Sequence, residues 1–184
     1  MVYIILAVFC VATSFTLNKL YQKKYCSDKK SLFIFTILMS LSGGLFFFCL
    51  NGFTIRFGGF TFVTALAVAV TVAFNNFTGL IIMKHCKMSL YMSFLMTGGM
   101  LIPFLYGVIF LDEKLTALRV IAMLMLLLAL FMPVVEKGGE KASRLGIILC
   151  VCVFLSNGIN STVSKIHQIS PQALGTNDFS FWLY

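Results

Sequence analysis

The sequence is poor in charged residues and in proline. Of its 184 residues only 11% are Asp, Glu, Lys or Arg, and there are 3 Pro; a soluble domain carries about 25% charged residues. So little polar surface excludes a disordered, collagenous or nucleic-acid-binding chain. The net charge is +8, but the basic residues lie between apolar runs, as cytoplasmic Lys and Arg do in membrane proteins. With 60% hydrophobic residues and a mean hydropathy of +0.99, the composition indicates an integral membrane protein.

The chain also lacks the residue patterns of enzymes and metal sites. Its 6 Cys show no metal-ligand spacing, and His85 and His167 are isolated from each other. There is no Ser/His/Asp set and no glycine-rich phosphate loop. None of the 6 carboxylates lies in the middle of an apolar run. We therefore expect no catalysis, no cofactor and no metal ion, and we interpret the Cys residues as small apolar side chains.

Long apolar runs dominate the sequence instead, each close to the roughly 20 residues that a helix needs to cross a bilayer. They predict membrane-spanning helices at residues 2–20, 32–50, 60–83, 90–111, 117–135 and 145–163, with a seventh beginning at Phe179. The first run lacks a basic leader and a small-residue cleavage site, which favours a retained helix over a signal peptide. The connections are short and polar, so no extramembrane domain is expected.

The two ends of the chain resemble each other when the sequence is shifted by 146 residues. Thr16, Lys19, Gln22, Phe33 and Phe35 then fall on Thr162, Lys165, Gln168, Phe179 and Phe181. Five spans, an odd number, separate the copies, so the second copy must enter the membrane upside down, as in inverted-repeat transporters. The alternative is that any two membrane helices share such patterns.

The repeat predicts a domain organisation within an all-α, polytopic membrane helix bundle. Residues 1–135 would form a first five-helix repeat, residues 136–145 a charged inter-repeat loop, and residues 146–184 the start of a second repeat. A full second copy needs about a hundred further residues if each span takes about 20. We therefore expect the chain to be the N-terminal part of a ten-helix protein.

The fourth and fifth predicted spans carry a motif that consists of a mid-helix proline, a Phe-Leu-x-Glu-x-Leu segment and an Arg-led apolar run. Its residues are Pro103, Phe110, Leu111, Glu113, Leu115 and Arg119. In this motif the chain resembles the EamA-like drug/metabolite transporter superfamily. The resemblance implies two inverted five-helix repeats that move small metabolites or drugs by alternating access. Family members keep both termini in the cytoplasm, whereas the Lys and Arg distribution places the N-terminus outside.

Polar side chains line one face of several predicted spans. Because the hydrocarbon core holds no water, such a face must turn towards another helix or a cavity. We predict one central substrate cavity lined by Ser14, Asn18, Thr71, Asn75, Thr97, Asn157 and Asn160. The alternative is that these residues only hold helices together, each contact contributing about 0.6–2 kcal/mol. Gly98, Gly99 and Pro103 suit either a hinge or close packing of the fourth helix.

These observations predict a secondary transporter, an exporter of small metabolites or drugs in the plasma membrane. The lack of a membrane-buried carboxylate favours an uncharged or zwitterionic substrate over a cation exchanged for protons. Glu113 is expected to shape a helix end and its loop. Lys19 and Lys165 are expected to snorkel to the interface, the alternative being contact with a substrate carboxylate.

The expected partners are the lipid bilayer and the small-molecule substrate. A homodimer is left open, and nucleic acid is excluded. The alternative function is a truncated, non-transporting membrane fragment that only packs or assembles with other helices.

Overall fold

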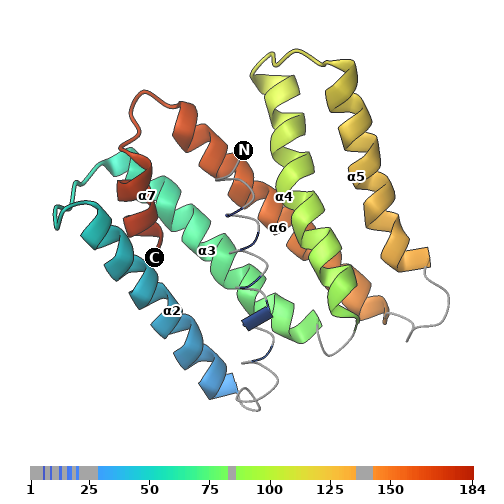
Figure 1. Cartoon of the computed structure of the whole chain (residues 1–184), viewed down its shortest axis with the longest axis horizontal. Coiled ribbons are helices and arrows are strands. Elements are labelled where there is room, and N and C mark those ends of the chain that lie inside the picture. Colours follow the sequence, from blue (N-terminus) through green and yellow to red (C-terminus); the bar gives the residue numbers. More distant parts are fainter. Residues whose placement is uncertain are drawn as a thin grey trace.

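The computed structural model describes residues 29–82, 86–135 and 143–184, together with Leu6, Phe9, Thr13, Thr16, Leu17 and Leu20. All regular secondary structure in these residues is helical. The helices are α2 (Lys29–Leu50), α3 (Gly59–Ile82), α4 (Met88–Phe110), α5 (Ala117–Val135), α6 (Arg144–Ile169) and α7 (Thr176–Leu183). Figure 1 shows α2 at one edge of the bundle and α5 at the other, with α3, α6 and α4 between them.

These helices confirm the all-α fold class, and α2 to α5 lie close to the predicted spans. By length and composition, α2, α3, α4 and α6 are able to cross a membrane. The fifth predicted span appears as helix α5, which has 19 residues. The apolar stretch described within it, Ala117–Leu128, is shorter than the stretches of the other four helices. The first predicted span lies outside the described residues except for the six positions named above. The described part of the chain is thus compatible with a multi-pass membrane protein.

Two predicted boundaries are wrong. Helix α7 begins at Thr176 instead of Phe179, and the end of α6 lies later than expected. Helix α6 continues to Ile169 instead of ending at residue 163. Polar residues in its last turns find partners in the protein, so the helix does not need to end where its sequence becomes polar. Lys165 binds Glu113, and His167 Nε2 lies 3.2 Å from Thr61 Oγ1. Lys165 is therefore a helix residue rather than part of a connection.

Helix α6 packs against both α3 and α4 and forms the centre of the bundle (Figure 1). At the crossing with α4, small residues bring the two backbones together. A Cβ atom added at Gly98 would meet the backbone of Phe154, and one added at Gly158 would meet the side chain of Ile102. Such small-residue contacts are the usual way in which membrane helices approach closely.

The short helix α7 is held between α2 and α3 by aromatic packing and two polar contacts. Tyr184 stacks on Phe47 with 5.9 Å between ring centroids. Asn51 Nδ2 donates to Asp178 Oδ1 at 3.0 Å, and Trp182 Nε1 donates to the carbonyl of Arg56 at 3.0 Å. These contacts fix the C-terminal segment against the ends of α2 and α3.

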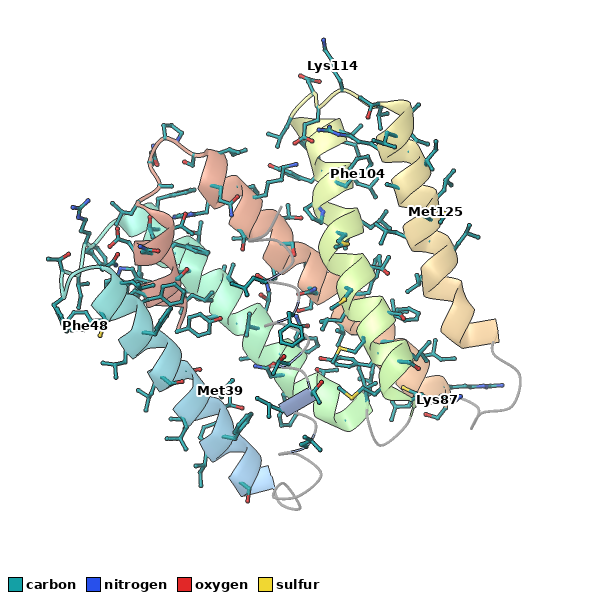
Figure 2. All side chains as sticks on the ribbon, viewed as in Figure 1. Met39, Phe48, Lys87, Phe104, Lys114 and Met125 are labelled. Carbon is teal, nitrogen blue, oxygen red and sulfur yellow. The ribbon has the colours of Figure 1, made fainter. Side chains whose placement is uncertain are left out.

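The outer helices present apolar surface. Large apolar side chains are exposed along α2 and α5, among them Met39, Leu45, Leu118 and Met125. Figure 2 shows Met39 on α2 and Met125 on α5, the two edges of the bundle. Exposed apolar surface on this scale is unusual for a soluble monomer and suits contact with lipid.

Candidate functional site

The polar face of α6 meets α3 at Ser156. Ser156 Oγ donates to the carbonyl of Thr71 at 3.5 Å, while Thr71 Oγ1 donates within its own helix to Val68 at 2.8 Å. In an α-helix the carbonyl of Thr71 also accepts the N–H of Asn75. Ser156 therefore lies beside the helical turn that carries Asn75.

The same face of α6 meets α4 at Asn157. Asn157 Nδ2 donates to the carbonyl of Leu95 at 2.7 Å. Gly99 makes room for this amide, because a Cβ atom at that position would lie 2.6 Å from Asn157 Nδ2. Thr97, between Leu95 and Gly99, is buried. Both bonds from α6 end on backbone carbonyls and join helices, which is what the helix-packing interpretation of these residues requires.

Asn75 differs from its neighbours. The residue is 6% exposed, and its Oδ1 atom is buried without a hydrogen-bond partner in the described part of the chain. Folded proteins leave few buried polar atoms unpaired, because each costs about 1–3 kcal/mol. Asn76, the next residue along α3, is exposed. Of these two neighbouring asparagines, only Asn75 turns its side chain into the protein, and its unpaired oxygen needs an explanation.

The structure places the predicted site residues as follows. Thr71, Asn75, Thr97, Asn157 and Asn160 lie on α3, α4 and α6. Ser156 and Asn157 are neighbours on α6. The first binds α3 and the second binds α4, so the three helices meet at these two side chains. Asn160 is half-buried one turn further along α6. Ser14 and Asn18 lie outside the described residues, so their placement stays a prediction.

A second polar cluster lies at the end of α4. Asp112 adopts a left-handed backbone conformation with φ of 49°, which short polar side chains tolerate better than others. The chain then turns back, and the N–H of Glu113 donates to the carbonyl of Gly107 at 3.1 Å. Gly107 carries no side chain, and a Cβ atom there would meet Lys165 Nζ and the Glu113 carboxylate. The turn and the glycine together place Glu113 against α6.

The carboxylate of Glu113 forms salt bridges with two basic side chains. Lys165 Nζ lies 2.5 Å from Oε1, and Arg119 Nη1 lies 3.3 Å from Oε2. Lys165 Nζ also donates to the carbonyl of Pro103 at 3.3 Å. The ammonium group of Lys165 thus finds acceptors on α4 and in the loop that follows α4, and the expectation that it snorkels to the interface stays a prediction. Lys19 lies outside the described residues.

A hollow of about 310 Å³ adjoins this cluster between α4 and α5. Apolar side chains form most of its wall, and Glu113 and Arg119 supply the charged part. Its apolar lining residues are Met100, Leu101, Phe104, Ala122, Met123 and Leu126. Figure 2 shows Phe104 on α4 and, beyond it, Lys114 pointing away from the bundle at the tip of the α4–α5 loop.

The ion pair predicts a pH dependence of stability. The hydrogen bond from Lys165, followed by the charges of Lys165 and Arg119, lowers the pKa of the Glu113 carboxyl from its usual 4.5. A carboxyl whose pKa is lower in the folded state stabilises the fold above its unfolded-state pKa, and this contribution is lost as pH falls through the folded-state pKa. We therefore expect the midpoint temperature of thermal unfolding to decrease when the pH of the solution is lowered below about 4.5.

The Glu113→Gln variant isolates this contribution. Other carboxyl groups titrate in both proteins, so the quantity to measure is the difference between the two unfolding midpoints at each pH. That difference should shrink as the solution is acidified. A difference that stays constant from neutral to acidic pH would exclude a stabilising role for the Glu113 charge.

Sequence reasoning missed two buried polar contacts near α7. Asp178 is 8% exposed and is held by Asn51, which lies 127 positions earlier. His167 is buried, and its ring lies 4.2 Å from that of Phe179. No local pattern in the sequence predicts either contact. Asn51 follows α2, and Phe179 lies on α7, the helix after the one that carries His167. Within the described ranges, His, Cys, Asp and Glu form no group of three that suits a metal ion.

Comparison with known proteins adds no further constraint on the site. The chain matches no family model, no curated protein and no solved structure. A functional interpretation therefore depends on the residues and contacts described above.

Proposed function

We propose that this protein is a secondary transporter of the plasma membrane that exports small metabolites or drugs by alternating access. The buried Oδ1 atom of Asn75, which has no hydrogen-bond donor among the residues that the structure describes, is the observation that carries this proposal. A buried acceptor without a partner is costly in an empty protein and becomes favourable when a ligand supplies the donor. Polar residues inside membrane helices commonly mark substrate pathways.

The chemistry of Asn75 narrows the substrate class. A carbonyl oxygen accepts hydrogen bonds and cannot donate them, so the substrate must present an N–H or O–H group. An amide carries no net charge, and it suits an uncharged or zwitterionic molecule. Thr71 and Ser156 lie on the neighbouring turns of α3 and α6 and would complete the polar wall.

In the proposed carrier, α2 to α5 belong to the first inverted repeat and α6 opens the second. The contacts of α6 with α3 and α4 would then lie at the repeat interface, where inverted-repeat carriers hold their substrates. The competing function is a helix-packing module, which the two bonds from α6 to backbone carbonyls favour. The two functions differ in what they predict for Asn75.

Replacement of Asn75 by leucine tests the proposal. We expect Asn75→Leu to weaken substrate binding about tenfold, or about 1.4 kcal/mol, because a ligand donor loses its acceptor. The same variant should leave the thermal stability of the empty protein unchanged or raised, since it removes an unpaired buried oxygen. The matched control is Asn76→Leu, an exposed position one residue away, which should change neither quantity.

The full chain in lipid nanodiscs is titrated with neutral amino acids, nucleosides and sugars, and thermal shifts are recorded. A quaternary ammonium compound without an N–H or O–H group serves as the ligand control and should not bind. Uptake into liposomes is then measured for each compound that binds. If Asn75→Leu destabilises the empty protein and no compound of the panel binds, Asn75 is a packing residue and the transporter proposal fails.

A further inference from the structure

Two cysteines that are 64 positions apart in the chain come together in the bundle. The Sγ atoms of Cys86 and Cys150 lie 3.9 Å from each other. Cys150 on α6 is 0% exposed, and Cys86, in the connection between α3 and α4, is half-buried. Both belong to an apolar cluster that contains Ile82 and Leu90. The pair therefore links the α3–α4 connection to the first half of α6.

The geometry is close to what a disulfide needs. Two sulfur atoms at 3.9 Å are in van der Waals contact, and a disulfide bond requires about 2.05 Å. Small rotations about the Cα–Cβ bonds of two neighbouring cysteines are able to cover part of this difference. Cys86 lies in a short connection, where the backbone adapts more easily than in the middle of a helix.

The difference in accessibility between the two thiols sets the order of their oxidation. Cys86 is half-buried, whereas Cys150 is buried. An oxidant from the aqueous phase therefore reaches Cys86 first, and Cys150 is the nearest thiol to resolve the product.

We propose that Cys86 and Cys150 form an oxidation-sensitive dithiol that closes to a disulfide in the presence of a peroxide. In the first step the Cys86 thiol and hydrogen peroxide give a Cys86 sulfenic acid and water. In the second step Cys150 Sγ attacks the Cys86 sulfur, the S–S bond forms, and hydroxide leaves and takes up the Cys150 proton as a second water. The peroxide accepts both electrons, and a dithiol reductant returns them.

The bond would attach α6 covalently to the connection between α3 and α4. In the proposed transporter, this would prevent the first repeat from moving against the second and would stop the transport cycle. That consequence rests on the proposed function, whereas the modification itself does not. Direct detection of the disulfide tests the modification separately from its effect on transport.

The full chain in lipid nanodiscs is treated with hydrogen peroxide, alkylated, digested and analysed by mass spectrometry. We expect a peptide pair joined through Cys86 and Cys150, with the loss of two hydrogens, that disappears after dithiothreitol. This measurement needs no variant. Two double variants then serve as matched controls. Cys49→Ser with Cys152→Ser should keep the linked peptides, and Cys86→Ala with Cys150→Ala should lose them.

Two outcomes would overturn the proposal. One is a dominant link from Cys86 to the exposed Cys49 or to Cys152. Cys152 lies two residues after Cys150 on α6 and therefore on another side of that helix. The other is oxidation of Cys86 to sulfinic acid, or no oxidation, without any link to Cys150. A link that forms while liposome uptake is absent would support the modification site and count only against transport.

Discussion

Replacing Gly98 by alanine should separate α4 from α6 and cost the fold about 3 kcal/mol or more, the upper end of what overpacking costs. The added Cβ atom would meet the carbonyl oxygen of Phe154 and lie 2.8 Å from the carbonyl carbon and Cα of the same residue. These are backbone atoms in the middle of a helix, so no side-chain rotation relieves the clash. The measurement is the thermal unfolding midpoint in detergent micelles, together with the fraction of monodisperse protein.

Two glycines provide the controls for Gly98→Ala. Gly59 begins α3 and has nothing within 4 Å of an added Cβ atom, so Gly59→Ala should be neutral. Gly158→Ala would press on the side chain of Ile102 and should show a smaller loss than Gly98→Ala, because a side chain yields more easily than a backbone. Equal midpoints for Gly98→Ala and Gly59→Ala would show that α4 and α6 do not pack closely at this point.

The helices were predictable from the sequence because a bilayer sets their length. The runs at 32–50, 60–83, 90–111 and 117–135 reappear as α2 to α5 with small shifts at their ends. The end of α6 was not predictable in this way. Hydropathy treats Lys165 and His167 as loop residues, and it contains no information about their partners, Glu113 in the α4–α5 loop and Thr61 on α3.

For the candidate site, the sequence predicted which side of each helix is polar but not which groups those side chains contact. A period of 3.6 residues places Ser156 and Asn160 on one side of α6, and the structure turns Ser156 towards α3. Its partner, the carbonyl of Thr71, is a backbone group that every residue possesses, so side-chain patterns do not reveal it. The pairs Cys86–Cys150 and Asn51–Asp178 were missed for a related reason. Each joins residues more than sixty positions apart.

Replacing Lys165 by methionine should destabilise the protein by about 2–3 kcal/mol, since charged hydrogen bonds contribute about this much when they are lost. The Lys165 side chain is 26% exposed, and its ammonium group donates to Glu113 and to the carbonyl of Pro103. Methionine has a similar length but cannot donate, so both acceptors lose a partner. Thermal unfolding in detergent measures the effect, and Lys114→Met, at an exposed loop position, should have none.

A double-mutant cycle with Glu113→Gln shows where the loss arises. Lys165→Met alone leaves the Glu113 carboxylate with only Arg119 at 3.3 Å, beside a helix that no longer offers a cation. The double variant removes both charges, so its loss of stability should be smaller than the sum of the two single losses. Strict additivity would mean that Lys165 and Glu113 act independently, and that the end of α6 is fixed by the contact between His167 and Thr61 instead.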